Sequence, residues 1–400
     1  MDEDKRVENE LKRNGISKYK IIHVITKSLS YLYKYGERKH EESYEDKIEV
    51  KFKYKNKVGG FSISSCQPDD VIARIVNDSI TKVYNMPVEW DERSISQYYV
   101  DNFRKQMFDS CSKVNCIKWL EKEITKIECG INKSTALFYK TELSKCSLRT
   151  NENYLEEYLT DAHLTCIVDK RKVEVSDSWL FIDFADTVLR QLKKPQLTYK
   201  NLDNNKKLLL KGKAVSQFIN KYILMYYASY VYEGNSFIKV EDLGNKLLEK
   251  DIDIIVLPYE KVYFDGEGCR MKIKEILKSG RLKNLLSNSL YSMYMGIESY
   301  GNSDMNNPYL IKHQRIVFMV NTTCVDADKG AAVLSEFQQL NINLKNNEVI
   351  GTAIMEEKDG KYLTVVNFKI DDFLNKLNSR SNSYGWHENV FCPDVFYDCS

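Results

Sequence analysis

The sequence lacks net charge and long apolar runs, and each absence excludes a class of protein. Its 59 lysines and arginines oppose 57 aspartates and glutamates, which leaves +2, so no overall field directs the chain to nucleic acid or to an anionic membrane. No apolar stretch reaches the roughly 18 residues that a membrane-spanning helix needs. The N-terminus, MDEDKRVENELKRNG, mixes both charge signs and has no apolar core of a signal peptide.

The sequence also has no closely spaced cysteine pair and only a few prolines. The ten cysteines are scattered and form no C-x-x-C pair, which excludes a disulfide scaffold and indicates reduced, mostly buried thiols in a cytoplasmic protein. Only 6 prolines stand against 27 tyrosines, a composition that favours a folded chain over a disordered one. A length of 400 residues predicts two or three domains.

The first half alternates strand and helix patterns. Residues 48–55 alternate apolar side chains with charged ones, and the turn NKVGG leads into a second strand through Phe61 and Ile63. No aromatic stacking platform accompanies the lysines of this strand, so we interpret them as a solvated face and not as a nucleic-acid stripe. Helices are predicted from Pro68 to Val83, over 116–130 with Gly130 as C-cap, and from about 178 to 194, ended by Pro195.

The second half is richer in strands. The polar segment KKPQLTYKNLDNN marks a domain break near Pro195–Asp203. A buried strand KLLL and one long core helix over 214–234 follow, then the strands DIDIIVLPY, RIVFMVN, VIGTAIMEE and YLTVVNF, the last two joined by an Asp-Gly turn. We therefore predict an α+β fold, with a strand-helix domain at 1–90, a middle domain at 91–203 and a β-rich domain of mixed sheets at 204–400.

The stretch YFDGEGCR, residues 263–270, brings two carboxylates together. Asp265 and Glu267 could be an acid/base pair of an active site. Gly266 and Gly268, however, suit a tight turn, and aspartate suits the first position of one. Without a partner for a nucleophile or a metal, we interpret the pair as a turn.

Residues 234–303 resemble the C-terminal domain of the TldD/PmbA family of peptidase subunits, also called modulators of DNA gyrase. The family pattern is carried by six motifs in order: G-x-S-F with Gly234, Ser236 and Phe237; L-G at 243–244; an acidic proline strand ending at Leu257–Pro258; F-D-x-E-G with Phe264, Asp265, Glu267 and Gly268; an i-x-x-G-x-L helix at 276–286; and G-N with Gly301 and Asn302. The resemblance extends more weakly to both ends of the chain, and it implies structural roles for the motif residues.

Catalytic members of this family carry His-Glu-x-x-x-His on the helix before the G-x-S motif, and a cysteine further on completes a zinc site. Counting back from Gly234, the two histidine positions are Ile219 and Leu224, and the glutamate position is Asn220. Isoleucine and leucine offer no zinc ligand. The resemblance therefore implies no catalytic residue and no metal in this chain, with zinc in a catalytic partner subunit.

One other histidine-cysteine pair is a candidate for metal binding. In HENVFC, His387 and Cys392 lie five residues apart. Gly385 before them and Pro393 after them argue against the helix that would bring both onto one face. We expect a buried or surface turn here and keep a metal site as the alternative.

The resemblance implies a non-catalytic subunit of a TldD/TldE-type heterodimeric metallopeptidase acting on unfolded or leader peptides. The chain would help form the peptide channel, and a homodimer is possible in isolation. Tyr226, Tyr227, Tyr230 and Tyr232 could face that channel, although core packing is the stronger expectation for most of them. The alternatives are an autonomous metallopeptidase with an unrecognised site, or a stand-alone peptide-binding or regulatory protein.

Overall fold

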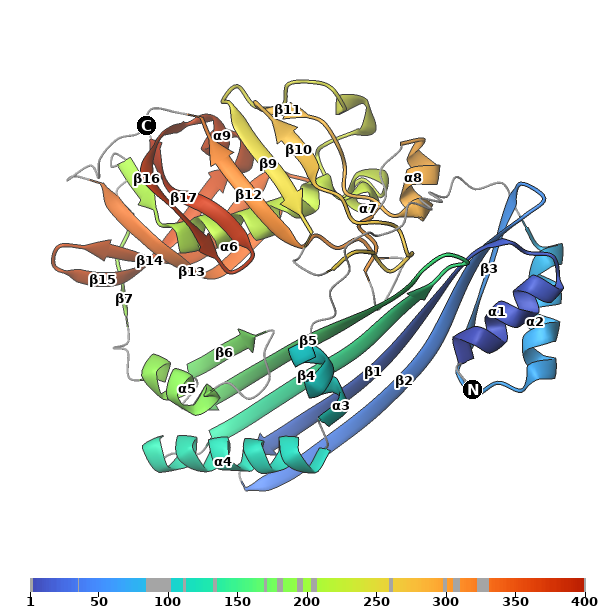
Figure 1. Ribbon diagram of the computed structural model, residues 1–400. Helices are drawn as coiled ribbons and strands as arrows, with labels where there is room; N and C mark the ends of the chain where they lie inside the picture. Colours follow the sequence, from blue (N-terminus) through green and yellow to red (C-terminus); the bar gives the residue numbers. More distant parts are fainter. Residues whose placement is uncertain are drawn as a thin grey trace. The chain divides into compact units, whose positions relative to one another are not determined.

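The chain divides into two compact units, residues 1–195 and 196–400 (Figure 1). The structure, a computed structural model, describes residues 3–34, 36–83, 102–110, 113–131, 135–168, 171–177, 183–192, 197–202, 207–258, 262–297, 301–304, 310–321 and 331–398. Each unit is described by itself.

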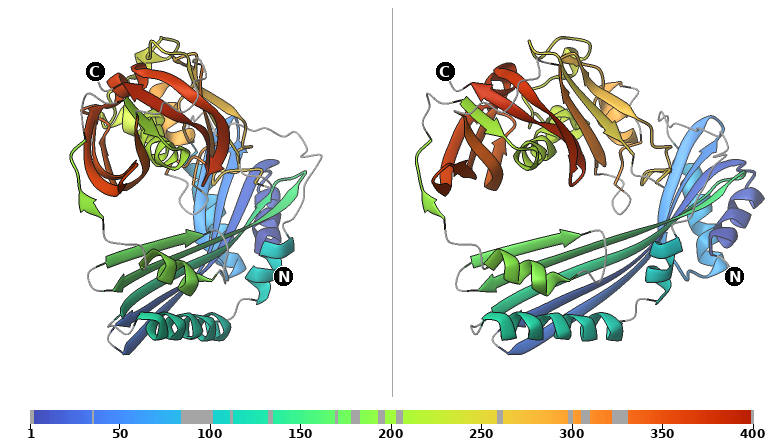
Figure 2. Two further views of the ribbon diagram at one scale, coloured as in Figure 1. Left: turned by 90° about the vertical axis from the view of Figure 1, so that its left-hand side faces the viewer. Right: turned by 60° about the vertical axis from the view of Figure 1, so that its left-hand side comes forward.

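The first unit is built on a six-stranded antiparallel sheet of order β3-β2-β1-β4-β5-β6, whose long strands are strongly twisted (Figure 2). Its strands are β1 (Lys18–Lys34), β2 (Glu37–Tyr54), β3 (Lys57–Ser64), β4 (Thr135–Arg149), β5 (Tyr154–Val168) and β6 (Arg171–Asp177). Its helices are α1 (Glu3–Arg13), α2 (Asp69–Thr81), α3 (Asn102–Ser110), α4 (Lys113–Ile131) and α5 (Phe184–Leu192).

The helices of this unit pack against one face of its sheet. Tyr19 and Ile21 of β1 belong to an apolar cluster with α1 and α2, whereas Leu29 and Tyr31 belong to a second cluster with α3, α4 and α5. All four residue numbers are odd, and side chains two apart along a strand share a face. The two helix groups therefore cover the two ends of the same face.

The division at 90/91 that we expected does not separate two compact units. Residue 90 itself lies outside the described residues. β1 pairs along its length with β2 on one side and with β4 on the other, so segments from both expected domains share one sheet. The break expected near Pro195–Asp203 begins where the two units divide.

The second unit is an eleven-stranded mixed sheet of order β11-β10-β9-β12-β17-β8-β13-β14-β15-β7, with β16 paired to β17. Its strands are β7 (Thr198–Tyr199), β8 (Lys207–Leu210), β9 (Ile252–Leu257), β10 (Lys274–Lys278), β11 (Arg281–Leu282), β12 (Arg315–Val320), β13 (Ala332–Asn343), β14 (Glu348–Glu357), β15 (Gly360–Lys369), β16 (Leu377–His387) and β17 (Val390–Asp398). Its helices are α6 (Gly212–Tyr222), α7 (Ala228–Tyr232), α8 (Ser289–Met295) and α9 (Ile370–Asn375), with 3-10 turns η1 (Ile223–Tyr226) and η2 (Val240–Asp242). The expected mixed α+β fold is confirmed.

Helix α6 lies at the centre of this unit's core. Ala214, Val215, Phe218 and Ile219 are buried, and α6 packs against β8, β13, β16 and β17 (Figure 1). Within the part of the chain that the structure describes, no helix is long and apolar enough to span a bilayer.

Three local predictions in the sequence are wrong. The long helix expected over 214–234 breaks at Tyr227, which is extended and is followed by an amide that donates to Leu286 O. The helix expected at 276–286 is instead the β10–β11 hairpin, because Ser279 and Gly280 both adopt positive φ. Gly130 lies inside α4 and not at its C-cap, and an added Cβ there would come within 2.7 Å of Leu189.

The helix expected from 178 to 194 is shorter in the described residues, where α5 spans Phe184–Leu192. Residues 178–182 and 193–196 lie outside the described part. The strand pair around NKVGG and the helix after Pro68 are confirmed as β2, β3 and α2.

Candidate functional site

The two carboxylates of the FDGEG segment are buried in the second unit. Phe264 and Arg270 pair as an isolated bridge that closes the turn between them. Asp265 is 0% exposed, and its Oδ1 accepts the backbone N–H groups of Glu267 (3.0 Å) and Cys269 (2.9 Å). Its Oδ2 accepts the N–H of Ser303 at 2.9 Å. A carboxylate with three backbone donors fixes the shape of this turn and joins it to the segment that follows Asn302.

Glu267 is 4% exposed and binds the start of α8. Its Oε2 accepts both the backbone N–H and the hydroxyl of Ser289, each at 2.7 Å. Asn288 caps the same helix by accepting the N–H of Tyr291. Glu267 therefore anchors α8 to the turn.

The glycines of this region are required by close backbone packing. A Cβ on Gly266 would lie 1.9 Å from the carbonyl oxygen of Asp304, and a Cβ on Gly301 would lie 2.8 Å from that of Arg270. Gly268 has φ +66° and Gly301 has φ +87°, a region that glycine adopts without a steric penalty. The FDGEG and GN motifs thus pack directly against each other.

The electrostatics of the turn resemble those of an active-site acid. Burial, and then the negative charge of Glu267, raise the pKa of the Asp265 carboxyl to about 6, against the opposing effect of the backbone donors. Ligand atoms of Asp265, Glu267 and Cys269 all lie within 4.8 Å of one another, so their spacing would also suit a cation. Both Asp265 oxygens, however, are already directed at backbone amides, and the group is closed to solvent. The geometry favours the turn over general acid/base catalysis.

The two positions at which the sequence count predicted the family's zinc ligands lie in the core of the second unit. Ile219 is fully buried on α6. That helix ends at Tyr222, and Leu224 lies in the 3-10 turn η1, partly buried against the same core. The two positions are therefore not on one regular helix, and neither side chain has a metal-ligating atom.

Asn220, at the glutamate position, belongs to a polar network that the sequence did not reveal. Its Nδ2 donates to Asn389 Oδ1 (2.8 Å), and its Oδ1 lies 3.4 Å from His313 Nε2. The other ring nitrogen, Nδ1, lies 2.6 Å from Tyr227 Oη, which accepts the backbone N–H of His313 at 3.0 Å.

The protonation of His313 follows from this network. Burial, and then the charge of Lys312, lower the pKa of His313 to about 4, so its imidazole is neutral at pH 7. The Tyr227 hydroxyl then donates to Nδ1, and Nε2–H donates to Asn220. Each polar side chain of this hydrogen-bond network has a partner, as expected for a network that stabilises the fold.

The G-x-S motif fixes the loop after α7. Gly234 has φ +70° with open space where a Cβ would be. Ser236 is buried, and its hydroxyl donates to Met225 O (3.0 Å) and accepts the N–H of Ile238 (3.1 Å). Asn302 of the G-N motif is also buried and accepts from Lys274 Nζ.

His387 lies on β16 and Cys392 on β17 of one hairpin, so the two residues are on paired strands and not on a helix. Both contact Gly212 at the start of α6: a Cβ there would lie 2.0 Å from His387 Nε2, and Cys392 Sγ donates to Gly212 O at 3.4 Å. Burial, and then the charge of Asp394, raise the pKa of Cys392 to about 12, so it is a neutral thiol. In the described residues two groups of three possible metal ligands occur, and neither includes this pair.

Two further clusters were missed in the sequence. Glu3, His23 and Asp46 converge in the first unit, and three tyrosines, Tyr232, Tyr291 and Tyr294, pack together at α7 and α8. The clusters join separate elements, so no sequence pattern marks them. Tyr226 and Tyr227 are buried, as expected for core residues, whereas Tyr232 is 54% exposed.

Comparisons with known proteins found one family model and several solved structures that are similar to this chain. Residues 204–398 match the family model described as the PmbA/TldA metallopeptidase C-terminal domain. No curated protein matches the sequence. Among solved structures, a modulator of DNA gyrase from Thermotoga maritima is similar with a TM-score of 0.69 and 17% identity, covering 98% of this chain and 97% of that one.

Two further solved structures are similar over nearly their whole length. TldE from Thermococcus kodakarensis gives a TM-score of 0.67 at 11% identity, covering 98% of each chain. A modulator of DNA gyrase from Bacteroides thetaiotaomicron gives 0.66 at 14% identity, covering 99% of this chain and 98% of that one. At these identities the likeness shows a shared fold.

Proposed function

This chain belongs to the TldD/PmbA family through its C-terminal half, and on that premise we propose that it is the non-catalytic subunit of a TldD/TldE-type heterodimeric metallopeptidase. The proposal rests on two residues of α6. Ile219 is buried in the core at the position where we expect a histidine in catalytic members. Asn220, at the position expected for their general base, is hydrogen-bonded to Asn389 and His313. Zinc would be held by the partner, and this chain would shape the cavity in which an unfolded or leader peptide is cut. The partner, the peptide and a cytoplasmic location belong to the same proposal.

The exposed tyrosine cluster supports a role in peptide contact. Tyr232 stacks on Tyr294 with ring centroids 5.2 Å apart, and Tyr291 packs edge-on against both. Tyr232 and Tyr294 remain 54% and 50% exposed. Tyr291 Oη donates to Glu233 Oε1, which fixes the cluster. Rigid tyrosines offer large contact area at low entropic cost, as a binding surface for varied peptides requires.

Co-expression tests the proposal. The chain is produced alone and together with a TldD-type subunit that carries His-Glu-x-x-x-His, and both preparations are assayed for hydrolysis of an unstructured peptide. We expect no hydrolysis by the chain alone and hydrolysis by the complex. Replacement of the partner's histidines must abolish activity. A stable complex in which Tyr232→Ala/Tyr294→Ala raises KM would support the peptide surface.

Two alternatives predict different results. An autonomous metallopeptidase would hydrolyse peptides without a partner and would lose activity on His387→Ala. A stand-alone peptide-binding protein would bind peptide but form no complex with a zinc subunit at micromolar concentration. Size-exclusion chromatography with light scattering separates these cases, and it also shows whether the isolated chain forms a homodimer.

A further inference from the structure

A histidine in the first unit is surrounded by carboxylates. His23 Nε2 lies 2.6 Å from Asp46 Oδ1, and His23 Nδ1 lies 2.8 Å from Asp4 Oδ1. A Glu3 oxygen joins this group, since ligand atoms of Glu3, His23 and Asp46 all lie within 4.8 Å of one another. Each of these three side chains is only partly buried, so the group can exchange ions with solvent.

The fold builds this arrangement from three elements. His23 of β1 lies opposite Ile48 of β2 in the strand register, so Asp46 is its diagonal neighbour on the same face. The first turn of α1 crosses that face and contributes Glu3 and Asp4. The backbone N–H of Cys66, after β3, donates to Glu3 Oε1 at 2.7 Å and holds that side chain in place.

Asp4 has the position of an orienting group for a metal-ligating histidine. It is 1% exposed, and Ser147 Oγ donates to its Oδ2. Its Oδ1 faces His23 Nδ1 at 2.8 Å, and this oxygen has no further hydrogen-bond partner in the described residues. Histidines that bind metals commonly direct their second ring nitrogen at such a carboxylate. That leaves Nε2 directed toward Asp46.

The charges around His23 favour a cation. Glu3, Asp4 and Asp46 contribute three negative charges, and an imidazolium neutralises only one of them. Arg149 contacts Asp4 from the far side at 4.0 Å. The hydroxyl of Tyr44 donates to Asp46 Oδ2 at 3.0 Å, which leaves Oδ1 directed at the histidine.

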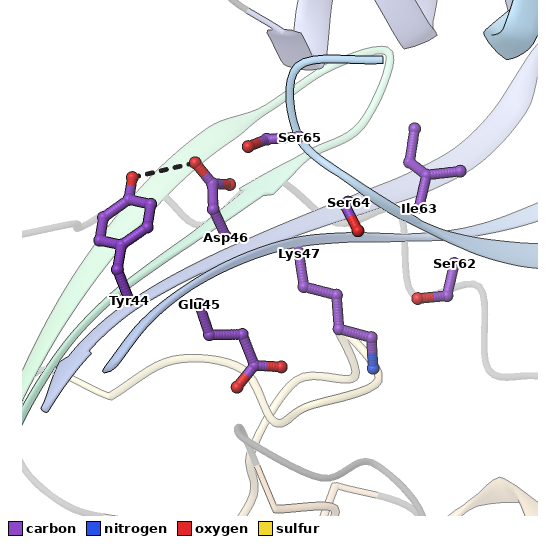
Figure 3. A pocket seen from close by; sticks show the side chains of 8 residues that line it. All are labelled: Tyr44, Glu45, Asp46, Lys47, Ser62, Ile63, Ser64 and Ser65. Atoms are coloured by element: carbon purple, nitrogen blue, oxygen red, sulfur yellow. Dashed lines mark hydrogen bonds between the residues drawn. The ribbon is translucent and has the colours of Figure 1, made fainter. Parts of the chain in front are cut away.

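A pocket adjoins this group at Asp46. It has a volume of about 500 Å³ and is lined by Tyr44, Glu45, Asp46, Lys47, Ser62, Ile63, Ser64 and Ser65. Figure 3 shows the Tyr44–Asp46 hydrogen bond on one side of β2, with Glu45 and Lys47 directed to the other. Asp46 thus belongs both to the ligand group and to the lining of this pocket.

From this geometry we propose that Glu3, His23 and Asp46 form a divalent transition-metal site of the zinc type, with Asp4 as the orienting carboxylate. A carboxylate oxygen of Glu3, Nε2 of His23 and a carboxylate oxygen of Asp46 supply three ligands, and water supplies the fourth. The ion takes the place of the proton on Nε2, which is released to solvent on binding. This site lies in the first unit and is independent of the proposed subunit function.

Zinc titration of the tag-free chain tests the site. The protein is stripped with a chelator, and zinc binding is followed by calorimetry, with Co²⁺ absorption as a report of the ligand set. We expect saturable binding of one ion per chain in this group, and Mg²⁺ should not compete because imidazole suits zinc better. His23→Gln should weaken zinc binding by about 100-fold, and Asp4→Asn by roughly 10- to 100-fold.

Two variants keep the test decisive. Glu3→Gln changes a partly exposed residue at the start of α1, so it should weaken binding without unfolding the protein even if His23→Gln does not fold. His40→Gln changes an exposed histidine of β2 and should leave binding unchanged. The proposal is overturned if zinc does not saturate the chain below about millimolar, or if folded His23→Gln and Glu3→Gln bind it as the natural sequence does. In either case the group is an ion-pair cluster that only attaches α1 to the sheet.

Discussion

Replacing Asp265 by asparagine separates the structural role of this residue from a catalytic one. The amide oxygen of Asp265→Asn can still accept the N–H groups of Glu267 and Cys269. Its NH₂ group then faces the N–H of Ser303, where the carboxylate now accepts. Two donors in contact leave one buried amide without an acceptor, at a cost of about 1–3 kcal/mol. Removal of a buried negative charge beside Glu267 offsets part of this cost.

The pH dependence gives the magnitude of that offset. The pKa of Asp265 is raised from 3.8 to about 6 in the fold, and a tenfold change in an acid dissociation constant corresponds to about 1.4 kcal/mol. The folded chain therefore binds more protons than the unfolded chain between these pH values, and its stability falls as the pH rises through them. The total is about 3 kcal/mol, of which roughly 1 kcal/mol is lost between pH 5 and pH 7. The Asp265→Asn variant has no titratable carboxyl at this position, so its stability does not fall with rising pH for this reason.

Urea denaturation from pH 4 to 7 measures the difference, and hydrogen exchange over residues 262–271 assigns it to the turn. The destabilisation caused by Asp265→Asn should shrink by about 1 kcal/mol from pH 5 to pH 7. Asp251→Asn, a change at an exposed carboxylate of the same unit, is the matched control and should show no such trend. Parallel profiles for Asp265→Asn and the natural sequence would refute the reasoning from burial. A folded, assembled but inactive Asp265→Asn complex would refute the structural role.

The remaining predictions address backbone fit, a buried histidine and the tyrosine surface. Gly266→Ala should yield little soluble protein because its Cβ would meet a backbone oxygen at 1.9 Å, whereas Gly234→Ala, at φ +70° in open space, should cost only about 1 kcal/mol by thermal unfolding. His313, whose pKa is lowered to about 4, should cause stability to fall as the pH decreases from about 6.5, by up to about 3 kcal/mol, and His313→Gln should flatten that limb of a denaturation profile. Tyr232→Ala/Tyr294→Ala should change the midpoint of unfolding little, because both rings are about half exposed, but should weaken peptide binding measured by fluorescence anisotropy.

Local patterns in the sequence were sufficient to predict many elements. Alternation over 48–55 and the turn that follows predicted β2 and β3, because side chains on a strand alternate between faces wherever the strand lies. Residue chemistry alone also excluded zinc ligation by Ile219 and Leu224. The six motifs in register pointed to a family whose C-terminal domain matches residues 204–398.

Contacts between distant segments could be decided only by the tertiary structure. The sequence from 214 to 234 has the composition of one helix, but pairing of Tyr227 with Leu286 breaks it. The pattern over 276–286 predicted a helix that includes Gly280, whereas in the hairpin a Cβ on Gly280 would lie 2.5 Å from Leu248 O and 2.6 Å from Lys250 O. The local sequence predicts Asp265 as a turn residue, and only the tertiary structure shows that it is fully buried and also accepts the N–H of Ser303.

The sites that the sequence did not reveal also depend on contacts between distant segments. Glu3, His23 and Asp46 are brought together by the register of β1 on β2 and by the crossing of α1. Tyr227 and His313 meet although 86 positions separate them. Periodicity and turn chemistry act over a few residues, whereas a binding site depends on which faces of distant elements meet, and that is set by burial of the whole apolar surface at once.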